Sequence, residues 1–148
     1  MFTIQVARKD DAGDIAKVHV ACFEQGWNSD YFIDVIDNPH YICLTALHDN
    51  EIIGLCLCSY IRGEIEIYSI CVLQKYRGLG IAKRMLDYIF HSYNYTSVSL
   101  EVSVENIAAL RLYKSAGFVE QSIRKGYYTE KGRCIDALRM IKYGSANT

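Results

Sequence analysis

The chain has 148 residues, the length of one ordinary domain, and we expect residues 1–148 to fold as a single domain. Hydrophobic residues make up 51% of it and charged residues 22%, so the composition is that of a globular protein and excludes a disordered one. A net charge of −1 argues against nucleic acid or an anionic membrane as the main partner.

Apolar runs and cysteines indicate the compartment. The longest apolar runs, such as residues 52–57, fall far short of the ~20 residues that cross a membrane, and residues 1–8 lack the pattern of an export signal. These features predict a cytoplasmic protein without a membrane partner. Six cysteines lie in apolar runs without the C-x-x-C spacing of metal or redox sites, which predicts reduced, buried thiols and no metal: Cys22, Cys43, Cys56, Cys58, Cys71 and Cys134.

The first half of the sequence predicts a helical pair followed by an antiparallel meander. Apolar residues recur every three or four positions before Cys22 and again after Ser29, which indicates two amphipathic helices. Residues 48–51 have the composition of a hairpin turn. The expected elements are a strand over residues 2–6, a helix capped by Asp10 and Asp11, a helix from Ser29 to Asn38-Pro39, and strands over residues 41–47, 52–60 and 64–73.

Strands and helices alternate in the second half. Residues 81–90 carry the clearest helical pattern, with one apolar face, and residues 98–104 alternate between apolar and polar side chains as a half-buried strand does. Asn106 is a good N-cap for a helix through Tyr113, and Gly117 is a good stop. Two closing strands are expected over residues 118–125 and 134–143, joined by a loop over residues 126–133.

Residues 68–82 predict a strand, a glycine turn and the start of a helix. This layout brings free backbone N–H groups and the positive end of a helix dipole to one point, which suits a phosphate. Gly78 and Gly80 let the backbone approach a ligand, and Arg77 and Lys83 add positive charge. A plain structural turn is the alternative. The segment does not fit a Walker loop, and the dinucleotide fingerprint fails at its third glycine, where Lys83 stands.

Two segments carry a resemblance to a known family. Residues 77–82 resemble motif A of the GNAT acetyltransferases, Arg/Gln-x-x-Gly-x-Gly/Ala. Residues 106–118 closely resemble another segment of that family, N-x-x-A-x-x-L-Y-x-x-x-G-F. The physical reading of the glycine turn and the resemblance therefore agree on a phosphate-bearing ligand.

Further segments bring the chain near one branch of this family, the RimI-type protein N-alpha-acetyltransferases that modify a ribosomal protein. They are residues 100–102, 126–128 and 136–140. The resemblance covers nearly the whole second half and is weak before Glu64. In the first half only residues 26–29 are similar to the branch, without the proline that usually precedes the tryptophan.

The resemblance implies an α/β fold, the GNAT fold, with a mixed, mostly antiparallel sheet and helices on both faces. The sheet is splayed between the strands that end near Val72 and Val104, and acetyl-CoA lies in the splay. Its pantetheine arm follows the backbone of residues 70–72, and its pyrophosphate lies at the turn of residues 77–83. The implied cofactor-binding residues are Ile70, Cys71, Val72, Arg77, Gly78, Leu79, Gly80, Ile81, Ala82, Lys83 and Asn106.

Glu101 and Tyr113 match the family in order and spacing, and both suit acid–base chemistry. A protonated amine does not attack a thioester, so a base must take its proton, and the departing CoA thiolate must receive one. Glu101, on the polar face of its strand, suits the first task, directly or through water. Tyr113, a phenol with an ordinary pKa of about 10, suits the second. The alternatives are that Glu101 is a solvated strand residue, that Tyr113 is a core aromatic and that Asn106 is only a helix cap.

We therefore expect direct acetyl transfer, in a ternary complex, from acetyl-CoA to the N-terminal α-amine of a protein, with a ribosomal protein as acceptor. Tyr127 and Tyr128 either line the acceptor cleft or pack as aromatic loop residues. Two other classes stay open: an acetyltransferase for a polyamine or an aminoglycoside, with an acidic, closed cleft, and a non-catalytic acyl-CoA-binding module. We expect the protein to be a monomer or a homodimer. The histidines form no ligand cluster and receive no role: His19, His40, His48 and His91.

Overall fold

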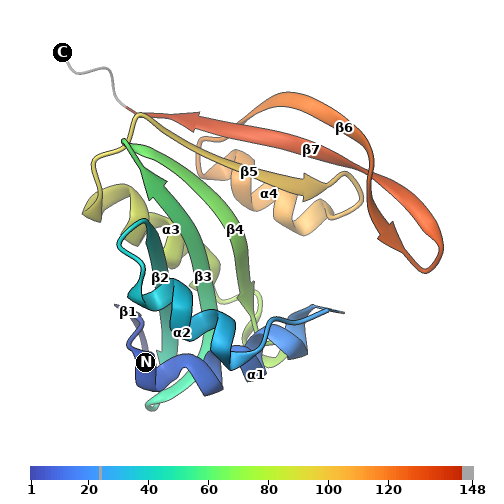
Figure 1. The fold of residues 1–148 in the computed structure, drawn as a ribbon. Helices are drawn as coiled ribbons and strands as arrows, with labels where there is room; N and C mark the ends of the chain where they lie inside the picture. The colour runs from blue at the N-terminus through green and yellow to red at the C-terminus, as the bar shows by residue number, and fades with distance from the viewer. Residues whose placement is uncertain (24, 145–148) are drawn as a thin grey trace.

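The strands of the protein form one sheet. The computed structural model describes residues 1–23 and 25–144, and within them seven strands pair in the order β1-β2-β3-β4-β5-β7-β6 (Figure 1). Every pairing is antiparallel except that of β4 with β5, so the expected mixed, mostly antiparallel sheet is confirmed. The strands are β1 (Phe2–Val6), β2 (Tyr41–His48), β3 (Glu51–Ile61), β4 (Glu64–Val72), β5 (Ser97–Ser103), β6 (Val119–Glu130) and β7 (Arg133–Tyr143).

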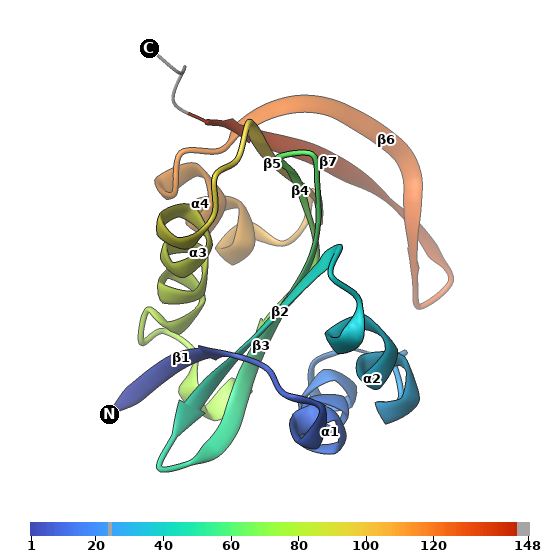
Figure 2. The ribbon, with the colours of Figure 1, turned by 60° about the vertical axis from the view of Figure 1, so that its left-hand side comes forward.

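Helices cover both faces of this sheet, as expected. One face carries α1 (Ala12–Cys22) and α2 (Ser29–Asp37), and the opposite face carries α3 (Ile81–Ser92) and α4 (Ile107–Ser115) (Figure 2). Two short 3-10 turns, η1 (Lys9–Asp11) and η2 (Gln74–Tyr76), precede α1 and α3. Over the described ranges, no helix is long and apolar enough to cross a membrane.

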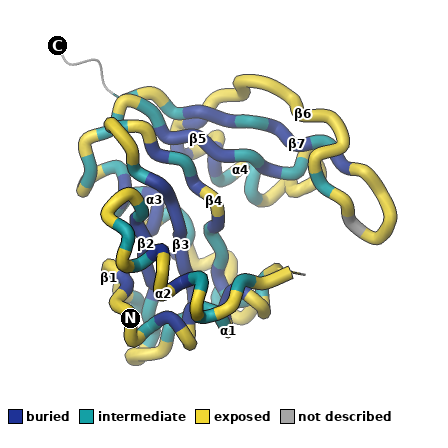
Figure 3. Tube along the Cα trace, in the orientation of Figure 1, coloured by how far each residue is buried: buried dark blue, intermediate teal, exposed yellow. Residues whose placement is uncertain are grey.

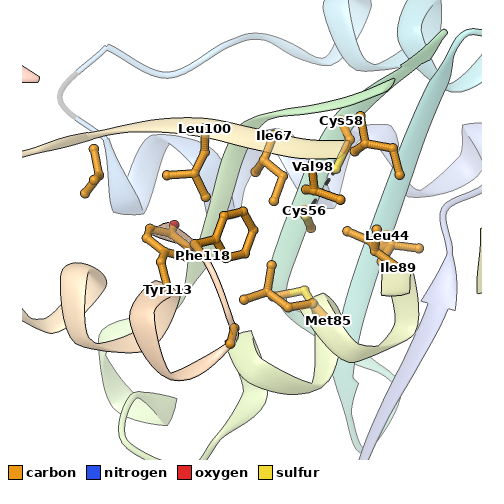
Figure 4. Packing of buried hydrophobic residues seen from close by; sticks show 14 of the residues in the cluster. Leu44, Cys56, Cys58, Ile67, Met85, Ile89, Val98, Leu100, Tyr113 and Phe118 are labelled. Atoms are coloured by element: carbon orange, nitrogen blue, oxygen red, sulfur yellow. Dashed lines mark hydrogen bonds between the residues drawn. The ribbon is translucent and has the colours of Figure 1, made fainter. Parts of the chain in front are cut away.

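The buried residues form two clusters, one on each face of the sheet. The α3 side of the sheet packs against Met85, Leu86 and Ile89, which follow one stripe of α3 (Figure 4). The other cluster packs α1 and α2 against the sheet and contains Ile15 and Phe32, both fully buried. The neighbouring strands β3 and β2 carry the longest buried stretches (Figure 3). The sheet therefore separates two cores.

Three hairpins are closed by turns of two residues. Both turn residues have positive φ in each case, which is the type I′ geometry that matches the twist of antiparallel strands: Asp49 and Asn50, Arg62 and Gly63, Lys131 and Gly132. The third turn corrects the sequence analysis, because the expected loop over residues 126–133 is mostly strand. β6 continues to Glu130 through a bulge between Arg124 and Tyr128, where Gly126 has φ +61°. Gly126 thus lies in a bulge, although a glycine at this place in the sequence is also typical of a turn.

Two further expectations need correction. Asp11 does not cap α1 with its side chain. Its carboxylate accepts a hydrogen bond from the Arg8 backbone N–H at 2.8 Å, and the 3-10 turn η1 leads directly into α1. Asn28 and Asn106 do cap their helices, through bonds of 3.0 and 3.2 Å. The six cysteines are free thiols, but Cys134 is exposed on β7, and Cys22 and Cys71 are only partly buried.

The sheet splits between β4 and β5. The two strands pair only from Glu64 to Ile67 and from Ser97 to Leu100, and beyond these residues they diverge (Figure 1). A bulge at Tyr68 follows Ile67, the last residue of β4 that pairs with β5. On the other side of β4, Ile67 pairs with Cys58 of β3 and Ser69 pairs with Leu57, so Tyr68 is the extra residue. The end of β4 therefore has a free backbone edge on its β5 side, and the splay expected near Val72 is confirmed.

Candidate active site

A cavity of about 550 Å³ lies at the split, beside the glycine turn. All the predicted cofactor-binding residues line it except Leu79, which is 57% exposed. The turn, the first residues of α3, the end of β4 and one face of α4 form its walls. The segment from Ile70 to Lys83 thus supplies most of this cavity, which we call the donor cavity.

The glycine turn gives the donor cavity a positive end. Gly78 and Gly80 have φ of +80° and +79°, and a Cβ at either position would touch nothing within 4 Å, so the backbone conformation rather than crowding favours glycine. Gly80 is the N-cap of α3 and offers no capping side chain, which leaves the first amides of the helix free. Arg77 and Lys83 stand beside them. This combination suits an anionic group such as a phosphate.

The free edge of β4 forms another wall of the donor cavity. The Val72 carbonyl accepts the Arg77 Nε–H at 2.9 Å and faces the Cys22 thiol at 3.7 Å. Cys22 and Cys71 both line the cavity. Interaction with the Cys71 thiol lowers the pKa of Cys22 to about 7, and interaction with Cys22, together with burial, raises the pKa of Cys71. Since the thiolate is the nucleophile, Cys71 is unsuited to form a covalent acyl intermediate.

A second cavity, of about 400 Å³, opens on the other side of the split, and we call it the acceptor cavity. It is lined by parts of α1, the α1–α2 segment, β4, β5, α4 and β6. The two cavities share the residues Phe23, Ile70, Asn106, Ala109 and Tyr113. Two ligands that occupied them would therefore meet beside Tyr113.

Tyr113 belongs to the core and to both cavities. The residue is 6% exposed, and its ring packs edge-on against Phe118 at 5.6 Å, in the same buried cluster as Leu100 and Met85 (Figure 4). No residue in the described part of the chain makes a hydrogen bond with its hydroxyl. Burial raises the pKa of Tyr113 above the ordinary value of a phenol, so the hydroxyl keeps its proton at neutral pH. The core-aromatic and the active-site interpretations of this residue are compatible.

Glu101 lines the acceptor cavity and is not a solvated strand residue, because its side chain is only 14% exposed. Its Oε1 lies 3.4 Å from Arg124 and 3.6 Å from Arg139. Its Oε2 is buried and, among the residues that the structure describes, has no hydrogen-bond partner. One oxygen of the carboxylate is thus held by arginines while the other is free to bind a ligand proton.

Arg139 belongs to a network that the sequence analysis missed. Its guanidinium donates to both oxygens of Glu66, at 2.8 and 3.2 Å, and to the Ser99 hydroxyl at 3.0 Å. Ser99 in turn donates to Glu66 at 2.7 Å. The hydrogen bonds with Glu66, and the charges of Glu66 and Glu101, raise the pKa of Arg139. This network fixes the cation that faces Glu101, and only the pairing of β4, β5 and β7 brings its members together.

The two predicted acceptor tyrosines differ. The Tyr128 hydroxyl donates to the Glu101 backbone carbonyl at 3.2 Å and lines the acceptor cavity, and burial, with the nearby Tyr127 and Glu101, raises its pKa to about 12. Tyr127 lines neither cavity and is 48% exposed, packed against Tyr128 and under the Arg124 guanidinium. Both lie on β6 rather than in a loop.

His19 and Trp27 also line the acceptor cavity, although the sequence analysis gave His19 no role. The His19 Nδ1 accepts the Trp27 backbone N–H at 3.0 Å, and the two rings stack at 4.4 Å. Burial lowers the pKa of His19, so the ring is neutral near pH 7 with its proton on Nε2. His19 therefore anchors the segment after α1 to the cavity wall. The similarity of residues 26–29 to one branch was the only sequence signal for this region.

Comparison with known proteins identifies the family. The family model described as the acetyltransferase (GNAT) family matches residues 13–118. An N-alpha-acetyltransferase of Saccharolobus solfataricus is 29% identical over 87% of both chains, and a putative ribosomal protein bS18-alanine N-acetyltransferase of Bacillus subtilis is 29% identical over 90% of this chain and 89% of its own. The crystal structure of the Escherichia coli ribosomal-protein-S18-alanine N-acetyltransferase has the same fold, with a TM-score of 0.92 and 22% identity over 100% of this chain and 97% of that one. The chain belongs to the GNAT family and is an acetyltransferase.

Proposed function

We propose that this chain, as a single-domain cytoplasmic enzyme, transfers acetyl from acetyl-CoA directly to the N-terminal α-amine of a protein, with a ribosomal protein as the favoured acceptor. The observation that carries the proposal is the place of Tyr113, where the donor cavity meets the cavity that contains Glu101. The names of the similar bS18-alanine and N-alpha-acetyltransferases support the choice of acceptor.

The donor cavity offers acetyl-CoA two kinds of polar contact. The free amides at the start of α3, with Arg77 and Lys83, would hold the pyrophosphate, and the free edge of β4 at residues 70–72 would pair with the amides of the pantetheine arm. Asn106 lines the same cavity while its side chain caps α4, so a role as helix cap is compatible with a contact to CoA. Bound here, acetyl-CoA supplies the thioester carbonyl that the amine attacks.

Glu101 and Tyr113 supply the two proton transfers. Glu101 Oε2 takes a proton from the ammonium group, directly or through one water, and the free nitrogen lone pair then attacks the thioester carbon to form the N–C bond. Tyr113 gives its proton to the sulfur as the C–S bond breaks, and it regains one from solvent afterwards. An N-terminal amine has a pKa near 7.7 to 8.0, so a carboxylate is a sufficient base at neutral pH. Binding both substrates at once makes the attack effectively intramolecular.

The composition of the acceptor cavity argues against a polyamine. Glu101 is the only carboxylate among the described residues that line it, and its Oε1 already faces two arginines. A ligand with three or four ammonium groups would need several carboxylates to offset their desolvation. One free carboxylate oxygen suits a single amine. A non-catalytic acyl-CoA-binding module gives no reason for the free groups on Glu101 and Tyr113.

The site of acetylation tests this proposal. A peptide that begins with alanine and carries an internal lysine is incubated with acetyl-CoA and the protein, with spermidine as a competitor, and the products are located by fragment mass spectrometry. We expect acetyl on the α-amine alone. Acetyl on spermidine or on the lysine side chain, with the α-amine untouched, would refute the proposed acceptor and leave the family assignment intact.

A further inference from the structure

One buried hydroxyl in the acceptor cavity has no partner. Ser69, on β4, is 6% exposed, and its Oγ makes no hydrogen bond within the described part of the protein. It lines the acceptor cavity together with Glu101, whose Oε2 is the one other buried side-chain N or O atom without a partner among the residues that the structure describes. Buried polar groups are nearly always paired, so two orphans in one cavity indicate a place for polar atoms of a ligand.

The bulge of β4 puts Ser69 in this position. Ile67 is the last residue of β4 that pairs with β5, opposite Leu100, and the extra residue Tyr68 shifts the alternation of side chains that follow it. Ser69 consequently shares its face with Cys71, which packs toward α1 and α2. Glu101 follows Leu100 on the neighbouring strand. Ser69 and Glu101 thus stand just beyond the last paired residues, on either side of the opening split.

We propose that Ser69 binds the first peptide carbonyl of the acceptor, so that the cavity selects an amine that carries a carbonyl on the adjacent carbon, as every protein N-terminus does. This inference rests on the proposed function and makes its substrate class more specific. Glu101 Oε2 can only accept hydrogen bonds and therefore binds the amine, whereas the Ser69 hydroxyl has a hydrogen to donate. The Tyr128 hydroxyl, which also lines the acceptor cavity, already donates its hydrogen to the Glu101 backbone carbonyl and is therefore not free to donate to the ligand.

Such a hydroxyl destabilises the free protein and is useful only when the ligand is bound. A buried hydroxyl without a partner costs free energy, which a ligand carbonyl in hydrogen-bonding distance recovers. An alkylamine offers no carbonyl and would leave Ser69 unpaired. A site built to hydrogen-bond one group discriminates strongly against analogues that lack it. Ser69 therefore favours a peptide over a polyamine independently of charge.

Ser99 provides a matched control on the adjacent strand. It is also 6% exposed, but its hydroxyl donates to Glu66 at 2.7 Å and accepts from Arg139 at 3.0 Å. Ser69→Ala removes an unpaired group, so its melting temperature should equal or exceed that of the wild type. Ser99→Ala removes a paired group and should lower the melting temperature.

The decisive experiment measures kcat/KM of the wild type and of both variants with each of two acceptors. One is a peptide that begins with alanine, and the other is the same peptide with an (E)-alkene in place of its first peptide bond, which removes the carbonyl and keeps the amine. We expect Ser69→Ala to lower kcat/KM for the peptide about tenfold, the effect of one lost hydrogen bond, and to change kcat/KM for the alkene analogue less than about twofold. Ser99→Ala should change both acceptors by the same factor.

Each contrary result has a definite meaning. If Ser69→Ala leaves the peptide reaction unchanged, or lowers the rates of both acceptors equally, Ser69 does not bind the carbonyl. The wild type would still acetylate the α-amine in that case, so the proposed function would survive. If the wild type acetylates neither acceptor on its α-amine, the proposed function fails and this inference fails with it.

Discussion

The donor and acceptor cavities lie on either side of the same split in the sheet, yet they are built differently. The donor cavity is made mainly by one continuous segment, from Ile70 to Lys83, and this segment offers a ligand the backbone of a free strand edge and of a helix N-terminus. The acceptor cavity draws side chains from six separate parts of the chain. A backbone-built cavity depends little on side-chain identity, whereas a side-chain-built cavity changes with each substitution, which explains how a common donor site serves different acceptors in one family.

The largest effect is expected where the two cavities meet. Tyr113→Phe removes a hydroxyl that has no hydrogen-bond partner in the described chain, and it keeps the ring packing against Phe118. We expect kcat to fall about 100-fold or more, since general acid catalysis contributes that much, with the Kd for acetyl-CoA and the melting temperature unchanged. Stopped-flow or steady-state kinetics and thermal unfolding check this. An unchanged kcat would exclude Tyr113 as the acid.

Glu101→Gln should damage the acceptor side alone. We expect kcat/KM for an α-amine peptide to fall about 100-fold at pH 7, and the Kd for acetyl-CoA to stay the same because Glu101 does not line the donor cavity. The loss should shrink as the pH rises past 8, where the amine is already unprotonated. A pH series of kcat/KM tests this, and a loss that stays constant from pH 7 to pH 9 would contradict the base role.

Gly80→Ala should damage the donor side alone. Gly80 has φ +79°, and an alanine there costs about 1–2 kcal/mol of backbone strain, although its Cβ has open space. We expect the Kd for acetyl-CoA to rise about tenfold, measured by calorimetry. Gly13→Ala is the matched control: Gly13 lies in α1 with open space around it and no positive φ, so alanine should stabilise the protein by up to about 1 kcal/mol. An unchanged Kd for Gly80→Ala would show that the turn conformation does not matter for the donor.

Arg139→Gln tests whether the charge network positions Glu101. The Arg139 and Glu66 side chains are 31% and 26% exposed, so the loss of their pair should cost about 2 kcal/mol of unfolding free energy, between surface and buried values. We expect kcat for the peptide to fall about tenfold without a change in the Kd for acetyl-CoA. Arg133 lies on the same strand as Arg139 and forms an exposed ion pair with Glu105. Arg133→Gln, which breaks this pair, should change the unfolding free energy by less than about 0.5 kcal/mol and leave kcat unchanged. Equal kinetics in the two variants would remove the positioning role.

The smallest effect concerns the anchor of the acceptor wall. The folded-state pKa of His19 is lowered below its unfolded value of about 6.5, so the unfolded chain binds more protons between these two values. His19 therefore stabilises the fold above pH 6.5, and this contribution is lost as the pH falls through the folded-state pKa. His19→Asn keeps an acceptor for the Trp27 N–H and does not titrate, so its unfolding free energy should depend less on pH between 7.5 and 5.5. Urea unfolding of the wild type and of His19→Asn at both pH values checks this. An equal change of unfolding free energy with pH in the two proteins would contradict it.

The same contrast explains what the sequence could and could not predict. The helices, the meander and the glycine turn were predictable because each depends on local pattern: the apolar stripe of α3, the Asn106 cap, and the glycines before Ile81. The Glu66, Ser99 and Arg139 network was not, because it joins β4, β5 and β7 through pairings that the sequence does not specify. The expected loop over residues 126–133 was wrong because a bulge glycine and a turn glycine have the same composition signal.

A crystal structure with a bisubstrate analogue, in which an acetyl linker joins the CoA sulfur to the α-nitrogen of a peptide, tests the central claim most directly. We predict CoA in the donor cavity, the linker beside the Tyr113 hydroxyl, and the first residue of the peptide in the acceptor cavity between Glu101 and Ser69. A peptide that left the linker along any other path, or a linker distant from Tyr113, would contradict the account.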